Sequence, residues 1–482
     1  VRPSRGVAAG RLTAAGRFAT LRAAFADPRP PQPEEPDMPR PVLPAAGPLL
    51  GTASVPGDKS LSHRAALFSP LGDGTARVRG FLRAQDTLRT LAAVRALGAD
   101  VHDDGTTLLI APGAFPATGP AARGAPLLEI DCGNSGTTAR LLLGLLAGRR
   151  VRARLDGDAS LRARPMGRVV APLRALGADI AYADAEGRLP AIVTGAALRG
   201  GVHAMGAPSA QVASALLLAA LSSSEPVTVR GCRGARDHTP RLLAAMGADL
   251  AGWEPGADEV SLRPGPPLRA VDHGIPADPS SAAFLLGAAA LVPGSRVTVP
   301  GVLLNPTRCG FLAVMREMGA DLAVATDAGG AEPTGAVTVS AGALDAVRID
   351  GAARVATLID ELPLLAVLAA RARGTSILRD AAELRVKESD RLAAVAAGLR
   401  GLGVAVVEHP DGLDIVGEPD GFPAPGPTAV ATHGDHRIAM AFAVAGLASR
   451  AGIVLDDDDC VAVSFPDFFG VCAALADGGS PG

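Results

Sequence analysis

Apolar and polar residues recur along the chain in one pattern, in which apolar residues three or four apart lead into Gly-Ala-Asp and another apolar residue. This spacing is typical of an amphipathic helix, and glycine is the residue favoured just past a helix end. The pattern therefore predicts a helix that stops at glycine and is followed by a short strand. Copies occupy Val94–Asp100, Leu173–Asp179, Leu243–Asp249, Val314–Asp321 and, less completely, Gly398–Val404. Their spacing of roughly 70–85 residues exceeds that of common solenoids, so each repeat is expected to be a unit of several helices and strands.

A second kind of segment lies between these copies and consists of a small or polar residue followed by a run of alanine and leucine. Such runs are apolar on most sides, so the helices they form are expected to be buried. We expect six of them, in two sets of three, beginning near Ser60, Gly136, Ser209, Ser280, Asp360 and His436. Because a helix N-terminus carries partial positive charge, these starts would together favour an anionic ligand.

Cations accompany many of these starts, in short segments rich in glycine and hydroxyl residues. The segments are Pro56–Arg64, Cys132–Arg140, Arg162–Arg168, Glu383–Arg391 and Thr432–Arg437. The candidate ligand-binding cations are Lys59, Arg64, Arg140, Arg164, Lys387, Arg391 and Arg437. One such segment alone is more often a capped helix start than a binding site. The segment Pro56–Arg64 is not a P-loop, because Asp58 replaces the glycine before the lysine. Together they predict an enzyme that binds one or two small ligands carrying several phosphate or carboxylate groups.

The segment Glu383–Arg391 also contains acids, Glu383 and Glu388, among its cations. Lys387 is four residues from both Glu383 and Arg391, so on a helix these side chains would share a face. Acids and cations packed together before an apolar run indicate a site that holds an anion and moves a proton.

Composition narrows the class of protein. The 482 residues suffice for two or more domains, and 48% hydrophobic with only 3% aromatic residues predicts a core of alanine, leucine and valine. The net charge of −3 argues against a general nucleic-acid binder. No apolar run reaches membrane-spanning length without a glycine, proline or charge, so no membrane contact is expected.

Metal and disulfide chemistry are not favoured either. The five cysteines are scattered without a C-x-x-C pair, which fits a reducing cytosol and gives no zinc or disulfide framework. Asp456–Asp459 lacks the spaced ligands of a calcium loop and is predicted to be a solvated turn.

The first 45 residues differ from the rest and are predicted to be a disordered extension. Val1–Ala26 is rich in arginine and alanine and poor in acids, and a proline-rich stretch follows it. A transit peptide has this composition, and so would a reading frame begun too early, which the internal Met38 favours. Under either interpretation the extension is expected to be dispensable.

An ordered set of motifs makes the chain resemble the enolpyruvyl transferases, and within them the class II-like bacterial 5-enolpyruvylshikimate-3-phosphate synthases. The resemblance extends over about residues 48–475. The motifs are Gly57–Arg64, Gly133–Thr137, Arg164–Gly167, Ser209–Gln211, Arg236–Thr239, Asp278–Ser281, Asn305–Arg308, Ile359–Pro363, Arg385–Arg391 and Asp435–Arg437.

The resemblance implies an α/β fold with two domains of three βαβαββ repeats each, an inside-out α/β barrel arrangement with the active site in the interdomain cleft. The domains would comprise residues 57–272, and residues 46–56 plus 273–476. The implied reaction moves the enolpyruvyl group of phosphoenolpyruvate onto the 5-hydroxyl of shikimate 3-phosphate and releases phosphate, in chorismate and aromatic amino-acid biosynthesis. It needs no metal or organic cofactor, and the protein is expected to be a cytoplasmic monomer.

Roles carry over from the resemblance position by position. Asp360 resembles the base for the 5-hydroxyl, and Glu388 with Lys59 the groups that handle the proton at C3. Shikimate 3-phosphate would be held by Lys59, Ser60, Arg64, Ser209, Ala210, Gln211, Arg236, Asp360 and Lys387. Phosphoenolpyruvate would be held by Lys59, Gly136, Arg164, Gln211, Arg391 and Arg437, with Arg140 and His436 nearby. Whether Arg308 and Asp278 contact a ligand or stabilise loops stays open.

The chain departs from the family pattern at two places. Many members carry a lysine just before Phe-Pro-Asp, where this chain has Val463-Ser464, and Pro240 follows Thr239 where glutamate is common. Gly136 is retained, whereas glyphosate-tolerant class II enzymes often have alanine there. Glyphosate is therefore expected to compete with phosphoenolpyruvate.

Three other classes are weaker matches. A UDP-N-acetylglucosamine enolpyruvyl transferase would carry a loop cysteine before Arg164, but none lies between Cys132 and Cys232. An RNA 3′-terminal cyclase would need a basic RNA-binding face. A binder without activity is not favoured, because Lys59, Asp360 and Glu388 are all present.

Overall fold

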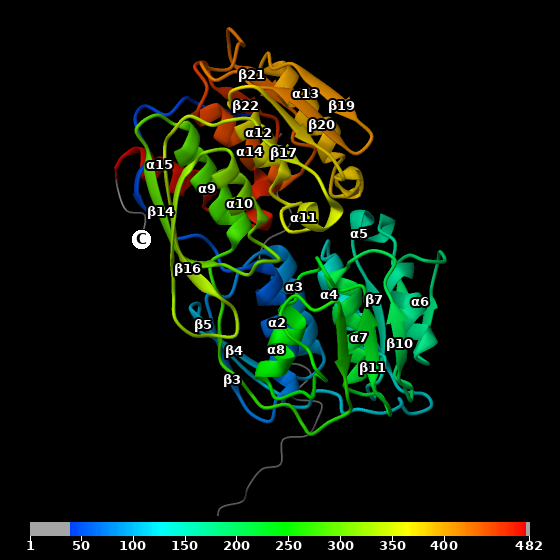
Figure 1. Ribbon diagram of the computed structural model, residues 1–482. Helices are drawn as coiled ribbons and strands as arrows, with labels where there is room; N and C mark the ends of the chain where they lie inside the picture. Colours follow the sequence, from blue (N-terminus) through cyan, green and yellow to red (C-terminus); the bar gives the residue numbers. More distant parts are fainter. Residues whose placement is uncertain (1–38, 479–482) are drawn as a thin grey trace, which may run out of the picture. The chain divides into compact units, whose positions relative to one another are not determined.

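Six small sheets and the helices packed on them build the part of the chain that the computed structural model describes, residues 39–478 (Figure 1). They enclose two hydrophobic cores. The core of the first lobe is drawn from residues 65–268, and the core of the second lobe from residues 42–53 and 282–475.

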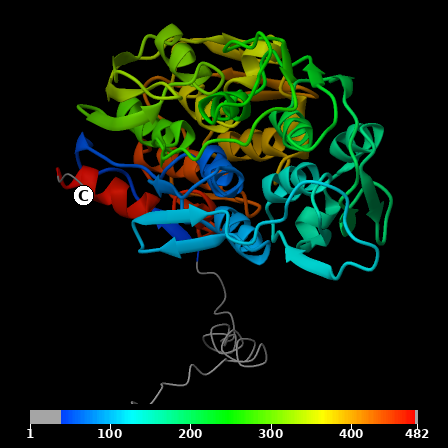
Figure 2. The ribbon, with the colours of Figure 1, turned by 90° about the horizontal axis from the view of Figure 1, so that it is seen from below.

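The first lobe contains three sheets. In strand order the first is β13 (His273–Gly274), β3 (Ala76–Arg79), β5 (Thr107–Ala111) and β4 (Asp100–Asp103). The second is β6 (Leu127–Asp131), β7 (Arg152–Asp156), β9 (Ala191–Thr194) and β8 (Asp179–Tyr182). The third is β10 (Gly201–Ala204), β11 (Val227–Arg230) and β12 (Glu259–Leu262). Figure 2 shows the light-blue strands β4 and β5 side by side as an antiparallel pair.

The second lobe also contains three sheets. The first is β15 (Asp321–Thr326), β16 (Thr334–Ser340), β14 (Arg296–Leu303) and β2 (Leu50–Thr52). The second is β17 (Arg348–Ile349), β18 (Thr375–Leu378), β20 (Gly412–Val416) and β19 (Val406–His409). The third is β1 (Arg40–Val42), β22 (Ile453–Leu455) and β21 (Thr428–Val430).

The buried helices predicted from the alanine and leucine runs are present, three in each lobe. They are α2 (Lys59–Phe68), α4 (Gly136–Leu146) and α7 (Ala210–Ala220), then α9 (Pro279–Leu291), α12 (Leu362–Ala369) and α14 (His436–Leu447). Every residue of α9 is buried. Small residues let these helices approach closely, because a Cβ on Gly144 of α4 would lie 2.1 Å from the carbonyl oxygen of Ala215 in α7.

The helices of the Gly-Ala-Asp repeats each pack one apolar face into these cores. They are α3 (Gln85–Ala96), α6 (Gly167–Ala175), α8 (His238–Ala245), α10 (Gly310–Glu317) and α13 (Arg391–Gly401). The glycines that follow them have φ between 82° and 96°, the left-handed region in which glycine is favoured, so the predicted stops are confirmed. A strand follows four of the five glycines. After Gly247 the prediction is wrong, because a turn through Gly252 and Gly256 leaves only an isolated bridge between Leu250 and Leu262.

Further short helices complete the described residues. They are α5 (Ala159–Ala163), α11 (Ala352–Ala356), α15 (Phe468–Ala476) and the 3₁₀ helices η1 (Ser69–Leu71), η2 (Ala382–Val386) and η3 (Asp459–Val463). The expected shared helical face of Lys387 and Arg391 is wrong. Helix η2 ends before Lys387, and α13 begins at Arg391 because Asp390 accepts a hydrogen bond from the amide of Ala393 at 3.1 Å.

The chain passes between the lobes twice. Strand β2 pairs with β14 in the second lobe before α2 enters the first, and β13 pairs with β3 before α9 returns. A bridge between Gly57 and Ala277 joins the two passages, and a Cβ at Gly57 would lie 1.9 Å from the carbonyl oxygen of Gly80. Only glycine fits this passage.

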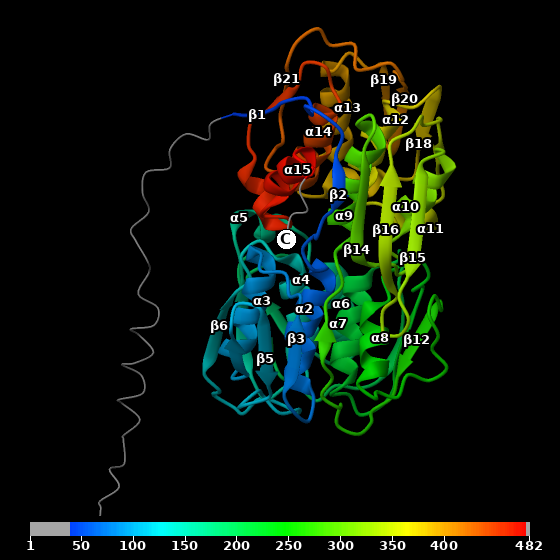
Figure 3. The same ribbon diagram turned by 90° about the vertical axis from the view of Figure 1, so that its left-hand side faces the viewer.

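The predicted N-terminal extension ran to residue 45, and residues 1–38 of it lie outside the described part of the chain. Arg40–Val42 differ from that expectation, because they form β1 and pair antiparallel with β22. Figure 3 shows the blue strands β1 and β2 among elements of the second lobe, near α14 and α15. Val42 is buried in that core, which explains why this segment forms a strand and not a disordered extension.

Candidate active site

Helix starts from both lobes surround one cavity of about 440 Å³. The first turns of α2 and α4, the start of α7 and the loop before α8 contribute from the first lobe. The starts of α9 and α14, the residues before α12 and the segment 383–391 contribute from the second. The predicted convergence of helix N-termini is therefore present, and their dipoles favour negative charge in the cavity.

Side-chain caps explain why the helices begin at these residues. Five of the six buried helices have an N-cap side chain that accepts a hydrogen bond from a first-turn amide; the caps are Asp58, Ser135, Ser209, Asp278 and Asp435. Three caps are carboxylates, which would repel an anionic ligand if they were left uncompensated. Each of these three is instead paired with a buried arginine of the site.

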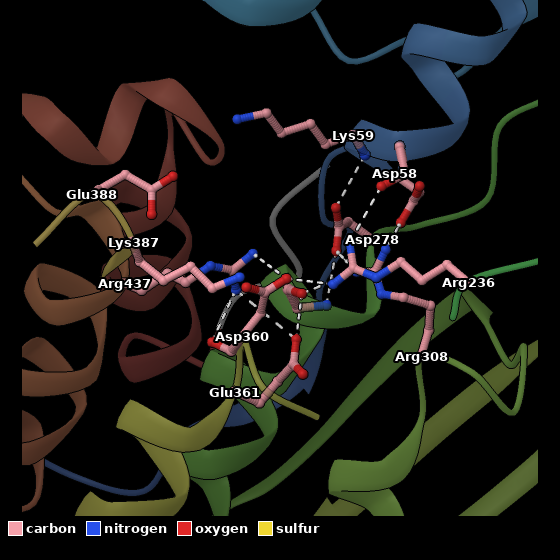
Figure 4. Close-up of polar contacts among 12 residues, drawn as sticks. Asp58, Lys59, Arg236, Asp278, Arg308, Asp360, Glu361, Lys387, Glu388 and Arg437 are labelled. Atoms are coloured by element: carbon pink, nitrogen blue, oxygen red, sulfur yellow. Dashed lines mark hydrogen bonds and ion pairs between the residues drawn. The ribbon is translucent and has the colours of Figure 1, made fainter. Parts of the chain in front are cut away.

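Arg308 compensates two of these caps at the passage between the lobes. Its guanidinium lies 2.7 Å from a carboxylate oxygen of Asp58 and 3.2 Å from one of Asp278, and it donates to Ser280 Oγ at 3.0 Å. Asp278 in turn accepts from the amide of Lys59 at 3.1 Å. Figure 4 shows the side chains of Asp58, Asp278 and Arg308 directed at one another. Arg308 and Asp278 border the cavity, but their polar groups hold the two passages together.

A first group of cavity arginines has carboxylate partners within the protein. Asp360 lies between Arg236, with which it forms a short ion pair, and Arg437 and Arg391, at 3.6 and 3.5 Å. Arg391, only 1% exposed, also contacts Glu388 at 2.6 Å and the cap Asp435 at 2.7 Å. We call Arg236, Arg391 and Arg437 the paired arginines.

These partners fix the charge of the acids. Burial alone would raise the pKa of Asp360, but the attraction of nearby cations, chiefly Arg437 and Arg236, holds it well below its usual range. Burial likewise opposes ionisation of Glu388, but Arg391 outweighs it and lowers the pKa of Glu388 to about 2. Both acids are therefore carboxylates near neutral pH.

A neutral histidine stands beside them. Burial, aided by the neighbouring cations, lowers the pKa of His436 to about 3. This imidazole therefore adds no charge to the cavity near neutral pH.

A second group of cavity arginines has no carboxylate within 4.0 Å among residues 39–478: Arg140, Arg164 and Arg168. Arg140 donates to Gln211 Oε1 at 2.8 Å and Arg164 to Asn134 Oδ1 at 2.7 Å. We call these three the unpaired arginines. Their mutual repulsion and the burial of Arg140, which lowers its pKa to about 10, make this wall receptive to an anion.

Each lysine of the cavity is paired with an acid, of which the sequence indicated Glu383 but not Asp86. Lys59 Nζ lies 2.5 Å from Asp86 on α3, and Lys387 Nζ lies 3.3 Å from Glu383. Asp86 gave no signal in the sequence, because only the packing of α3 on α2 brings it to Lys59.

Nearly all predicted site residues border the cavity. These are Lys59, Ser60, Arg140, Arg164, Ser209, Ala210, Gln211, Arg236, Asp360, Lys387, Glu388, Arg391, His436 and Arg437. Gly136 lies at the start of α4, where an added Cβ would be 2.7 Å from Arg140 Nη1 and 3.6 Å from Arg164 Nη1. Arg64 lies behind the cavity instead and donates to Thr239 Oγ1 and Ser214 Oγ, both at 2.8 Å, and to the carbonyl of Ser60 at 3.0 Å.

The residues that line the cavity but were not selected from the sequence include His63, Arg168 and Ser464. Arg168 is the last residue of the segment Arg162–Arg168, so its closeness to Arg164 in the sequence could have identified it. His63 lies one helical turn after Lys59, and the same reasoning would have found it. Ser464, from the segment without the expected lysine, also lines the cavity.

Residues 39–478 contain neither a membrane-spanning helix nor a metal-binding cluster. No helix in residues 39–478 is both long and apolar enough to cross a membrane. No cluster of three or more histidine, cysteine, aspartate or glutamate residues in this range has the geometry to hold a metal ion.

Comparisons with known proteins agree with the motifs. The family model for EPSP synthase (3-phosphoshikimate 1-carboxyvinyltransferase) matches residues 44–472. The 3-phosphoshikimate 1-carboxyvinyltransferase of Chloroflexus aurantiacus is 44% identical over 89% of this chain and 97% of its own length. That of Anaeromyxobacter sp. is 47% identical over 90% of this chain and 98% of its own.

Solved structures give the same result. An EPSP synthase from Acinetobacter baumannii superposes with a TM-score of 0.80 and 36% identity over 90% of this chain and 97% of that chain. The enolpyruvyl transferase NikO from Streptomyces tendae, with a TM-score of 0.68 and 20% identity over 90% of this chain and 96% of that one, shares the fold. The fold is therefore the two-domain enolpyruvyl transferase fold, and the chain belongs to the EPSP synthase (3-phosphoshikimate 1-carboxyvinyltransferase) family.

Proposed function

We propose that the cavity transfers the enolpyruvyl group of phosphoenolpyruvate to the 5-hydroxyl of shikimate 3-phosphate and releases phosphate. The observation that carries this proposal is the meeting of Lys59, Asp360 and Glu388 with two groups of arginines in one cavity, in a chain of this family. Both substrates are polyanions, and the wall of unpaired arginines lacks the anions that would balance it.

The cavity wall divides into two parts that suit the two substrates. Hydroxyl and amide groups at the starts of α2 and α7, with Arg236 and Lys387, would bind shikimate 3-phosphate; they are Ser60, Ser209, Ala210 and Gln211. Arg64 would act from behind by holding the carbonyl of Ser60. Arg164, Arg391 and Arg437, with the amide of Gly136, would bind phosphoenolpyruvate, and Arg140 and Gln211 would support them.

Asp360 would accept the proton of the 5-hydroxyl while the hydroxyl oxygen forms a bond to C2 of phosphoenolpyruvate. The carboxylate is ionised, as a base must be, but the arginines that lower its pKa also weaken it. Substrate phosphates and carboxylates that bind those arginines would share their charge and raise the pKa of Asp360 again. Base strength would therefore increase only when the anionic substrates are present.

The remaining proton transfers take place at C3. In the addition a proton is delivered to C3, which gives a tetrahedral ketal. In the elimination C3 loses a proton as the bond between C2 and the phosphate oxygen breaks. Glu388 is ionised and can take the proton in the elimination; its pKa of about 2 makes it a weak base, and phosphoenolpyruvate bound to Arg391 would raise that pKa. Lys59 and His436, both at the cavity wall, are candidates to share this work.

The same assignment extends to inhibition, assembly and domain organisation. Glyphosate, an anion, would compete with phosphoenolpyruvate at the wall formed by Gly136, Arg140 and Arg164. Activity that is insensitive to micromolar glyphosate would contradict this. We also propose a cytoplasmic monomer with domains of residues 57–272, and of residues 46–56 with 273–476, in keeping with the separate cores.

Phosphate release tests the function directly. Shikimate 3-phosphate with phosphoenolpyruvate should release phosphate, UDP-N-acetylglucosamine should not replace the acceptor, and Asp360→Ala should abolish the signal. Release with UDP-N-acetylglucosamine alone would assign the protein to the other enolpyruvyl transfer reaction. Release with neither acceptor would contradict the proposed activity.

A further inference from the structure

A chain of buried hydrogen bonds joins α2, α3 and α4 behind the cavity. His63 Nδ1 lies 2.7 Å from Thr90 Oγ1, Thr90 Oγ1 lies 2.5 Å from Thr138 Oγ1, and Thr138 Oγ1 lies 2.7 Å from Ser135 Oγ. All four side chains are fully buried. No part of the proposed reaction uses these hydroxyls, but a buried polar network whose hydroxyls are all hydrogen-bonded makes the helices that it joins rigid.

Both ends of this chain lie at the active site. His63 borders the cavity one turn after Lys59. Ser135 caps α4, whose first turn begins with Gly136. The opposite side of that turn faces the cavity, where Thr137 Oγ1 accepts from Gln211 at 3.0 Å and Arg140 follows one turn later. These hydrogen bonds therefore support the first turn of α4 on the side away from the cavity. The other side of that turn forms part of the wall of unpaired arginines.

Helix α3 connects the two walls through one face. Asp86 and Thr90 are four residues apart on α3 and so lie on the same side. Asp86 pairs with Lys59 at 2.5 Å, and Thr90 bonds to both His63 and Thr138. One rigid helix thus sets the position of Lys59 relative to the start of α4.

The order of donors is fixed by the cap. Ser135 Oγ accepts from Thr138 Oγ1 and from the amide of Thr138, at 2.7 and 3.2 Å. Since Thr138 has a single hydroxyl proton, Thr90 donates to Thr138 and His63 Nδ1–H donates to Thr90. His63 Nε2 is then a bare acceptor, and it has no partner among the described residues. Burial lowers the pKa of His63 to about 3, so this tautomer stays neutral.

We propose that Thr90 is a positioning residue for the phosphoenolpyruvate half of the site, acting through Thr138 and Ser135 on the first turn of α4. This role rests on the proposed function. It predicts that loss of the Thr90 hydroxyl weakens the binding of phosphoenolpyruvate selectively, because Arg140 and the amide of Gly136 move with that turn. Shikimate 3-phosphate, held mainly from α2, α7 and the second lobe, should be affected little.

The test compares Thr90→Val, which keeps the shape but removes the hydroxyl, with Thr90→Ser, which keeps the hydroxyl. Thr90→Val should raise KM for phosphoenolpyruvate about 5- to 10-fold, the effect of losing the one hydrogen bond that reaches Thr138 on α4, with KM for shikimate 3-phosphate within about twofold of wild type. Thr90→Ser should restore most of the loss. Thr138→Val, which breaks the same chain, should reproduce the effect, and the double variant should be no worse than either single one.

Thr87→Val is the matched control. Thr87 is also fully buried on α3 and donates to the carbonyl of Leu82 at 2.5 Å, but it is outside the chain to α4. It should lower Tm without the selective change in KM. If Thr90→Val does not fold, Thr138→Val and Thr90→Ser decide the question.

The positioning role would be overturned, with the function left intact, if KM for phosphoenolpyruvate were unchanged in Thr90→Val. It would also be overturned if Thr90→Val and Thr87→Val both raised KM for the two substrates by the same factor. A wild-type protein that releases no phosphate would overturn the proposed function and this role with it.

Discussion

The two groups of arginines in the cavity balance their charge differently. The paired arginines, Arg236, Arg391 and Arg437, have their positive charge neutralised by Asp360, Glu388 and Asp435. The unpaired arginines, Arg140, Arg164 and Arg168, have only neutral partners or none within residues 39–478. The first group is therefore part of the folded structure, and the second is an unbalanced charge that a ligand would neutralise.

This difference separates stability from binding. Removing a paired arginine leaves buried carboxylates without a partner, whereas removing an unpaired one relieves repulsion between like charges. A substitution in the first group should therefore reduce both stability and activity. A substitution in the second should reduce activity alone, which makes the two groups distinguishable by experiment.

The largest effect is expected for Arg391→Met. Arg391 is 1% exposed and contacts Asp435, Glu388 and Asp360, so its loss should cost about 3–5 kcal/mol of unfolding free energy and abolish phosphate release. Urea unfolding measures the first and the phosphate assay the second. Arg385→Met is the control. Arg385 pairs with Asp390 and Glu408 at 2.9 and 3.0 Å but is partly exposed, and its loss should cost at most about 1 kcal/mol. Equal costs for the two variants would show that the paired arginines are not structural.

Arg164→Gln should give the opposite combination. One or two charged hydrogen bonds to the substrate would be lost, so KM for phosphoenolpyruvate should rise about 10- to 100-fold. Tm should stay the same or increase, because Arg164 repels Arg140 in the free protein. Thermal unfolding in the absence of substrate is the deciding measurement. A fall in Tm like that of Arg391→Met would remove the distinction between the groups.

The pH dependence of stability sharpens the same comparison. The pKa of Glu388 is lowered to about 2 from its ordinary value of 4.5, so the folded state binds this proton less readily than the unfolded chain does. The stabilisation is therefore present above about pH 4.5 and is lost as pH falls from 4.5 toward 2. Glu388→Gln should lower Tm by a few degrees at pH 6 and much less near pH 3, relative to wild type. Arg164→Gln should shift Tm equally at both values. A constant difference for Glu388→Gln would contradict the ionised pair.

Much of the fold followed from the sequence because its signals are local. The glycines after the repeat helices, such as Gly98 and Gly177, mark stops that depend on one residue's φ. The alanine and leucine runs marked the buried helices for the same reason. The strand expected after Gly247 failed, since the glycines of the following turn compete with pairing.

The site was less accessible to sequence reasoning wherever it depends on distant packing. The motifs identified Lys59 and Arg391, but not that Asp86 and Asp435 neutralise them across the chain. Arg64 looked like a ligand residue from its motif, yet its hydrogen bonds within residues 39–478 go to protein atoms behind the cavity. Local spacing identifies the residue type that a site needs, while its partner is set by tertiary contacts.

The smallest expected effect concerns Arg168, the unpaired arginine without any hydrogen bond or ion pair from its guanidinium to another of residues 39–478. An exposed cation at the cavity wall attracts an anionic substrate over distance, so Arg168→Gln should lower kcat/KM for phosphoenolpyruvate about two- to threefold at low salt and leave kcat unchanged. The difference from wild type should vanish as ionic strength rises, because salt screens exposed charges over about 10 Å at 0.1 M. Arg174→Gln, on the same helix but paired with Glu186 at 3.2 Å, should show no such dependence. A loss that persists in high salt would instead mean that Arg168 contacts the bound substrate directly, which would extend the unpaired wall by one ligand-binding residue.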